Sequence, residues 1–201
     1  MSTLPSLSFE FFPPNTSVGS EKLRGVVAEL APLAPAYFSV TYGAGGSTRD
    51  KTLSTVQDIA ALGHEAAPHL SCIGSTRQGI AELLELYRGQ GIRRLVALRG
   101  DLPSGVVTAG EFRYASELVA FIRQTQGRDW LVEVAAYPEY HPQQRYARRD
   151  LEHFAHKVKA GADAAITQFF FNPDAYFHFV DEVRKLGVTV PIVPGIMPFH
   201  N

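Results

Sequence analysis

The sequence has a single cysteine, Cys72, which excludes an internal disulfide bond and a zinc site built from several cysteines. Its positive and negative charges are nearly balanced, with 19 Lys and Arg, 20 Asp and Glu, and a net charge of −1. Without a basic stripe or a charged tail, we expect no nucleic-acid partner and no membrane surface. Its apolar runs are far shorter than the roughly 20 residues of a bilayer span. The start, "MSTLPSLSFE", lacks the pattern of a signal peptide, so we expect a cytoplasmic protein.

Strand-like and helix-like segments alternate along the 201 residues, and each pair has roughly the 30 residues of a βα repeat. Short aromatic and β-branched runs predict strands, whereas apolar residues at three- and four-residue spacing predict helices. The predicted strands cover residues 7–12, 37–43, 65–72, 93–100, 131–138, 164–170 and 190–197. The predicted helices cover residues 20–31, 77–91, 114–125, 150–161 and 174–187, and one more follows the glycine-containing loop after the second strand.

Such a series without low-complexity linkers predicts one α/β domain, either a closed (β/α)8 TIM barrel or an open doubly wound sheet. The open dinucleotide-binding sheet would carry a glycine fingerprint after its first strand, and "FEFFPPNTSVGS" (9–20) has none. We therefore favour the barrel. Only seven strands are readable, so we expect one barrel domain over residues 1–201 that is C-terminally incomplete, with the last strand and helices absent from this chain.

Polar side chains gather where the predicted strands end, which is the face that carries the active site in such barrels. These residues are Glu10, Thr41, Tyr42, His69, Arg99, Asp101, Tyr137, Glu139 and Gln168. A mixture of carboxylates, histidine and aromatic rings suits a large, flat, partly anionic ligand. The residues alone do not name that ligand.

Several of these features also have simpler interpretations. The loop with glycines 43, 45 and 46 could bind a phosphate through backbone amides at a helix start, or could be a plain connection. Arg99 and Asp101 could form a local ion pair. Cys72 is expected to be a packed, inert thiol. His153 and His156, three residues apart, can share one helix face, but the seven histidines show no metal-ligand spacing, so a metal-dependent hydrolase is the weakest alternative.

Seven segments, in order, resemble the bacterial methylenetetrahydrofolate reductases. They are "SFEFFPP", "SVTYGAGGSTRDKT", "AAPHLSC", "LVALRGDLP", "AAYPEYHP", "KVKAGADAAITQFFF" and "VPGIMP". The resemblance implies a (β/α)8 barrel that binds FAD at the carboxyl ends of its strands. It implies reduction of 5,10-methylenetetrahydrofolate to 5-methyltetrahydrofolate with NADH or NADPH, by a ping-pong route through the flavin. The reaction belongs to one-carbon metabolism and methionine biosynthesis, and the family suggests a homo-oligomer.

The resemblance also implies roles for particular residues. Glu10 matches the general acid that protonates the departing folate nitrogen, and we expect burial among Phe9, Phe11 and Phe12 to raise its pKa. Asp101 matches a carboxylate beside the flavin and the folate, and Gln168 matches a folate contact. No metal ligand is implied. The matched cofactor positions are Thr41, Tyr42, Ala44, His69, Arg99, Gly100, Asp101, Tyr114, Ala115, Tyr137, His141, Asp150, His153, His156 and Lys157.

Two departures from the family pattern affect these expectations. His153 and His156 stand where members often have an amide and a basic residue. The family pattern also continues past "GIMPFHN", with further nicotinamide and folate contacts and an eighth strand. The sequence therefore leaves two hypotheses: a flavin-dependent reductase represented without its C-terminal part, with NADH favoured over NADPH, or a non-catalytic remnant that binds flavin or folate.

Overall fold

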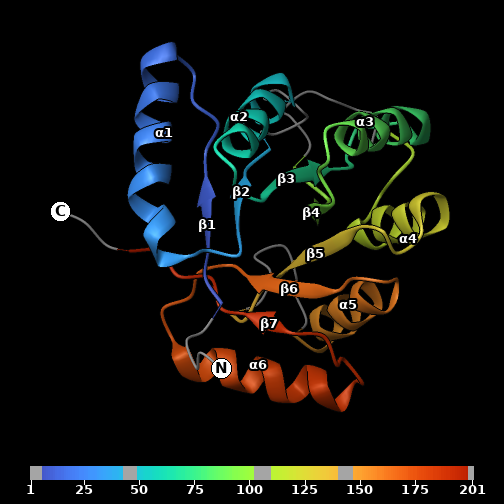
Figure 1. The fold of residues 1–201 in the computed structure, drawn as a ribbon. Helices are drawn as coiled ribbons and strands as arrows, with labels where there is room; N and C mark the ends of the chain where they lie inside the picture. Colours follow the sequence, from blue (N-terminus) through green and yellow to red (C-terminus); the bar gives the residue numbers. More distant parts are fainter. Residues whose placement is uncertain (1–5, 43–48, 102–109, 140–146, 199–201) are drawn as a thin grey trace.

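The computed structural model describes residues 6–42, 49–101, 110–139 and 147–198. In these ranges seven parallel strands pair with their neighbours in chain order, from β1 at one edge to β7 at the other. The sheet curls, and the helices lie around its outer side (Figure 1). A doubly wound sheet reverses its strand order at a switch point, and this order has no reversal. The predicted (β/α) barrel architecture is therefore confirmed for the described strands.

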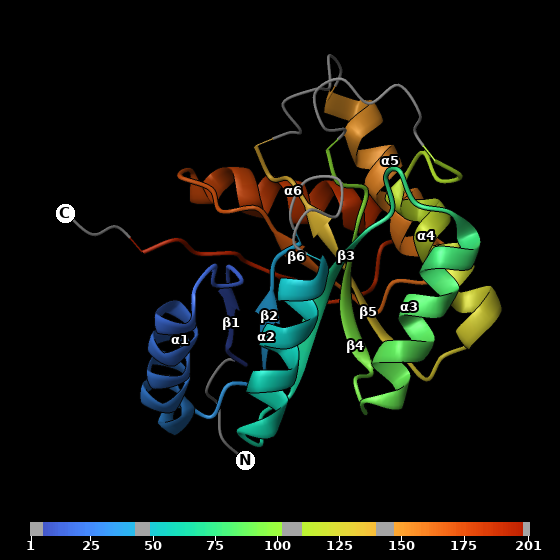
Figure 2. The ribbon, with the colours of Figure 1, turned by 90° about the horizontal axis from the view of Figure 1, so that it is seen from above.

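The element bounds agree with the predicted alternation of strands and helices. The strands are β1 (Ser8–Phe11), β2 (Tyr37–Val40), β3 (Ala66–Ser71), β4 (Arg94–Leu98), β5 (Leu131–Ala136), β6 (Ala164–Thr167) and β7 (Ile192–Val193). The helices are α1 (Ser17–Leu30), α2 (Arg49–Ala61), α3 (Arg77–Gly89), α4 (Ala115–Gln126), α5 (Ala147–Lys159) and α6 (Pro173–Lys185), with a short 3-10 helix η1 (Ala31–Leu33) after α1. In Figure 2, α1, α2 and α3 run alongside the strands. None of the helices in the described ranges is long and apolar enough to cross a membrane.

The last strand is much shorter than the predicted span of 190–197. It keeps only two residues, which lie between Pro191 and Pro194. Proline has no N–H to donate to a strand ladder, so it ends a strand inside a sheet. The sequence beyond it continues as an extended segment that packs closely on β6, because the Gly195 amide donates to Thr167 Oγ1 over 2.9 Å.

The core lies between the sheet and the helices. Trp130, Tyr87 and Phe38 are among its fully buried side chains. The rings of Phe9 and Phe11 stack on Phe38, with centroids 5.9 and 5.7 Å apart. Since side chains alternate along a strand, this contact turns the residue between Phe9 and Phe11 to the opposite face of the sheet.

A largely buried ion pair joins α4 to the start of β6, at the amino ends of the strands. The Arg123 guanidinium donates to Asp163 Oδ2, to the Gly161 carbonyl over 2.7 Å and to the Trp130 carbonyl over 2.8 Å. Asp163 Oδ2 also accepts the Val132 amide over 2.7 Å. Arg123 thus donates hydrogen bonds to partly buried carbonyls in two loops, the one before β5 and the one before β6.

We expect Arg123→Leu to lower the free energy of unfolding by about 3 kcal/mol, because the largely buried Asp163 carboxylate then keeps only the Val132 amide and Arg128 at 3.8 Å, and the Gly161 and Trp130 carbonyls lose this donor. Urea unfolding followed by circular dichroism measures this loss. The control is Arg24→Leu, which breaks the exposed Arg24–Asp58 pair (3.3 Å) and should cost about 0–1 kcal/mol. Equal losses in the two variants would contradict this account of Arg123.

Candidate active site

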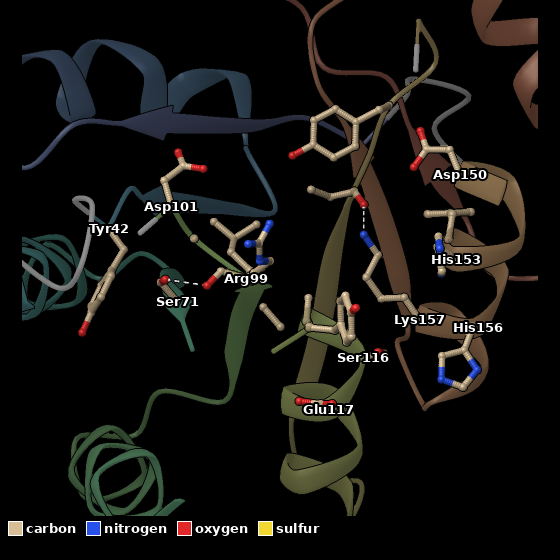
Figure 3. Close-up of a pocket in the computed structure, with 18 of the residues that line it drawn as sticks. Tyr42, Ser71, Arg99, Asp101, Ser116, Glu117, Asp150, His153, His156 and Lys157 are labelled. Atoms are coloured by element: carbon tan, nitrogen blue, oxygen red, sulfur yellow. Dashed lines mark hydrogen bonds between the residues drawn. The ribbon is translucent and has the colours of Figure 1, made fainter. Parts of the chain in front are cut away.

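A cavity of about 680 Å³ opens at the carboxyl ends of the middle strands, between them and helices α4 and α5. Figure 3 shows Arg99 and Asp101, which follow β4, on one side and Asp150, His153 and Lys157 of α5 on the other. A cavity of this size is in the range of small-molecule and cofactor sites. Its position is the face that carries the active site of (β/α) barrels.

The structure brings most of the predicted cofactor positions together in this cavity. Those that line it are Tyr42, Arg99, Gly100, Asp101, Tyr114, Ala115, Tyr137, Asp150, His153, His156 and Lys157. They come from the ends of β2, β4 and β5 and from one face each of α4 and α5. Residues that are more than 100 positions apart in the sequence therefore surround one space.

Four predicted site residues lie at the same ends of the strands but do not line this cavity. Thr41 continues β2, where its amide donates to the Phe11 carbonyl over 2.9 Å. Gln168 continues β6, where its amide donates to the Ala136 carbonyl over 2.8 Å. The other two are Glu10 and His69, which contact each other. The predicted positions Ala44 and His141 lie outside the described residues.

Glu10 projects from β1 towards His69 on β3, with 3.4 Å between Glu10 Oε2 and His69 Nε2. The His69 side chain is 8% exposed and that of Glu10 is 52% exposed. The hydrogen bond from His69 lowers the pKa of Glu10; burial acts in the opposite direction and is outweighed. The expected rise in this pKa is therefore wrong for the protein without ligands. The physical reason is that Phe9 and Phe11 face the core, Phe12 is largely exposed, and a histidine instead meets the carboxylate.

Lys157 is a half-buried cation that lines the cavity from α5. Its ammonium donates to the Ala135 carbonyl of β5, as drawn in Figure 3. Burial lowers the pKa of Lys157 to about 8, although the nearby Asp150 carboxylate acts to raise it. An anionic ligand beside this amine would favour its charged form and so raise its pKa again.

The turn after β4 sets the positions of Arg99 and Asp101. Gly100 between them has a φ of +80°, a conformation that only glycine adopts readily. A Cβ at this position would lie 1.8 Å from Ser71 Oγ. That hydroxyl donates to the Arg99 carbonyl over 2.9 Å, so β3 and the turn after β4 are packed without room for a side chain.

His153 and His156 both line the cavity from α5, which confirms that their spacing places them on one helix face. Both are exposed, so they lie at its rim. Within the described ranges, no group of three or more His, Cys, Asp or Glu side chains is arranged to hold a metal ion.

Cys72 is fully buried behind the cavity, where burial raises the pKa of its thiol to about 12. Its Sγ lies 3.8 Å from the carbonyl oxygens of Arg99 and Tyr114. The thiol is therefore a packed group that stays protonated at neutral pH, as the sequence predicted.

Sequence reasoning missed several residues that line the cavity. They include Ser71, Ser116, Glu117, Phe154 and Phe179. Alternation along β3 could have found Ser71, since it lies two residues after His69. The others lie on helices. Which face of a helix meets the cavity depends on packing between elements, and a single sequence does not specify that packing.

A second, smaller hollow of about 220 Å³ lies where β6 and β7 end. It is lined by residues 169–171, all phenylalanine, and by residues 194–197. Gln168 immediately precedes this apolar segment. The described residues therefore offer a cavity of mixed polar and apolar lining near the middle of the sheet and an apolar hollow near its β7 edge.

Residues 2–201 match the family model described as methylenetetrahydrofolate reductase. The chain is 45% identical over 198 residues to the 5,10-methylenetetrahydrofolate reductase of Pectobacterium carotovorum and 44% identical over 197 residues to that of Salmonella typhimurium. These alignments cover 98% of this chain and 65% of each bacterial relative. A plant relative, methylenetetrahydrofolate reductase (NADH) 1 of Arabidopsis thaliana, is 40% identical and is covered over 36% of its length.

Solved structures support the fold at low sequence identity. An uncharacterized protein from Clostridium thermocellum that binds two copies of 5-methyl-5,6,7,8-tetrahydrofolic acid superposes with a TM-score of 0.65 at 16% identity, over 94% of this chain and 64% of that one. Tryptophan synthase from Mycobacterium tuberculosis gives 0.59 at 14% identity, over 95% and 74% of the two chains. At such identities the likeness concerns the fold alone.

Proposed function

Because this chain belongs to the methylenetetrahydrofolate reductase family, we propose that its cavity serves an FAD-dependent reduction of 5,10-methylenetetrahydrofolate to 5-methyltetrahydrofolate. NADH is the proposed hydride donor, in line with the name of the plant relative. The chain spans 65% of the length of these bacterial relatives, so the activity of the whole reductase is a proposal for this chain.

The observation that carries the proposal is the convergence of the matched positions. Thirteen of the fifteen predicted cofactor positions lie in the described ranges, and eleven of these thirteen line the one cavity. They were assigned as positions that match the family, and they are spread from residue 42 to residue 157. A chance resemblance would not gather such distant positions around one cavity.

The residues of the cavity fit a flavin dinucleotide. The Lys157 ammonium donates to the Ala135 carbonyl, and its lowered pKa marks a site where an anion such as a diphosphate would be stabilising. Arg99, on the turn after β4 at the other side of the cavity, adds a second cation, and Tyr42 and Tyr137 supply aromatic surface. When bound, FAD would supply the chemistry that accepts a hydride from NADH and passes it to the folate.

Glu10 is the proposed general acid. Opening the imidazolidine ring of the substrate to an iminium needs a proton on the departing nitrogen. In the protein without ligands, His69 favours the ionised form of Glu10. A substrate that displaces water from this half-exposed carboxylate and weakens its contact with His69 would raise the pKa of Glu10 and so allow the carboxyl to hold the proton.

Asp101 and Gln168 complete the proposed substrate side. The Asp101 carboxylate at the cavity can stabilise the cationic iminium by its charge. The Gln168 amide group, at the end of β6, can donate and accept hydrogen bonds with a heterocycle. Both follow strands whose carboxyl ends meet at one face of the barrel.

The proposal is tested by titrating the purified 201-residue chain with FAD and then adding NADH without oxygen. We expect a visible flavin spectrum with a stoichiometry of one, which bleaches on addition of NADH. A chain that stays colourless in excess FAD would contradict the proposed cofactor site. FAD that binds and does not bleach would contradict the proposed hydride donor.

The affinity for FAD should fall as the pH rises through about 8. Below that pH the Lys157 ammonium is charged and attracts the diphosphate; above it the amine loses its proton and the attraction. The loss of one such charge corresponds to about tenfold in Kd, or 1.4 kcal/mol. Fluorescence titrations between pH 7 and 9.5 measure the change. Lys157→Arg keeps its charge over this range, so an equally steep pH dependence in that variant would contradict the assignment to Lys157.

A further inference from the structure

Glu139, three residues beyond the end of β5, contacts the connection that leads from β6 to α6. Its Oε1 accepts the Phe171 amide over 3.3 Å and the Asn172 amide over 3.1 Å. These two residues immediately precede α6, and Asn172 caps that helix by accepting the Asp174 amide on its Oδ1 over 3.0 Å. A side chain from one strand end thus holds the backbone that follows the neighbouring strand.

The segment held by Glu139 is the one that begins with Gln168. Its first amide is fixed by the Ala136 carbonyl at the end of β5. Within the segment, the Phe170 ring stacks on Tyr176 at a centroid distance of 5.3 Å, and the Tyr176 hydroxyl donates to the Ile192 carbonyl of β7 over 2.9 Å. Residues 168–172 are therefore held at one end by Ala136 of β5, at the other by Glu139 beyond β5, and in the middle by Tyr176 of α6, which contacts β7.

The position of Glu139 also suits its charge. Amides at the start of a helix lack partners within the helix, and the helix dipole favours a carboxylate there. Hydrogen bonds from backbone N–H groups to an ionised carboxylate are roughly twice as strong as neutral ones. The contact is thus charge-assisted, although Glu139 and the two amides that it accepts are exposed at the surface.

We propose that Glu139 is a positioning residue that fixes Gln168 relative to the cofactor cavity. Glu139 lies two residues after Tyr137, which lines that cavity. It also accepts two amides of the segment whose first residue is Gln168. Gln168, on the proposed substrate side, is thereby held at a constant position relative to the cofactor cavity. This proposal rests on the proposed function, in which Gln168 contacts the folate.

Amide hydrogen exchange measured by NMR tests the positioning without any activity. In Glu139→Ala we expect the Phe171 and Asn172 amides, and residues 168–170 with them, to exchange at least tenfold faster than in the original chain. Glu139→Gln should restore most of the protection, because its amide oxygen still accepts both bonds. Unchanged exchange in Glu139→Ala would overturn the proposal, whether or not the protein reduces folate.

The second readout compares the two halves of the proposed reaction. Glu139→Ala should raise the apparent Kd for methylenetetrahydrofolate about tenfold and leave the rate of bleaching by NADH within twofold. Glu111→Ala is the matched control, since Glu111 accepts the Arg77 amide at the start of α3 over 2.7 Å but does not touch residues 168–172. Equal changes in folate affinity for both variants would overturn the proposal. Absence of folate turnover in the unmodified chain would instead overturn the proposed function.

Discussion

Replacing Glu10 by glutamine should reduce the rate of folate reduction by about 10²–10⁴, the range in which a general acid contributes. Glutamine keeps the shape of the side chain but cannot give up a proton to the departing nitrogen. Bleaching of the bound cofactor by NADH needs no such proton, so its rate should stay within twofold. Stopped-flow absorbance of the two half-reactions, recorded separately without oxygen, measures both rates.

The control for this variant is Glu29→Gln, the same change on the exposed surface of α1. It should leave both half-reactions unchanged. If Glu10→Gln slowed both half-reactions equally, Glu10 would be part of the cofactor site and the proposed acid would have to be sought elsewhere. If neither half-reaction slowed, the carboxyl would have no role in the chemistry.

Replacing Gly100 by alanine should weaken FAD binding at least tenfold. The new Cβ would lie 1.8 Å from Ser71 Oγ and 3.1 Å from Ile73 Cγ2, so either the Ser71 hydroxyl must rotate away and release the Arg99 carbonyl or the turn after β4 must move. That turn carries Arg99 and Asp101 into the cavity. Fluorescence titration with FAD measures the change in affinity.

Gly91 after α3 supplies a matched control, because its φ of +79° is almost the same and a Cβ there would meet nothing within 4 Å. Both alanine variants should lose about 1–2 kcal/mol of stability to the left-handed backbone. Only Gly100→Ala should lose affinity for FAD. Unchanged FAD binding in Gly100→Ala would show that the cavity does not depend on the position of this turn.

The sequence predicted those features that depend on a simple period or on strand order. Alternation along β1 places Glu10 on the face opposite Phe9 and Phe11, and these two rings pack on Phe38. Polar residues at predicted strand ends correctly marked the face of the barrel, since parallel strands all end on one side. The three-residue spacing of His153 and His156 correctly placed both on one face of α5.

Other features depend on contacts between distant residues and were not predictable in this way. The partner of Glu10 is a buried histidine two strands away in the sheet, and this contact reverses the expected direction of the pKa shift. The attachment of Glu139 to Phe171 and Asn172 joins residues 32 and 33 positions apart. Such pairs depend on the register of the strands and on side-chain rotamers, neither of which a single sequence states.

The most direct test of the central claim is the second half of the proposed reaction. The chain with bound FAD is bleached by NADH without oxygen, separated from excess NADH, and mixed with 5,10-methylenetetrahydrofolate. We expect the yellow colour to return and one equivalent of 5-methyltetrahydrofolate to form per bound FAD. A cofactor that remains bleached, with no methyltetrahydrofolate detected by mass spectrometry, would contradict the proposed function.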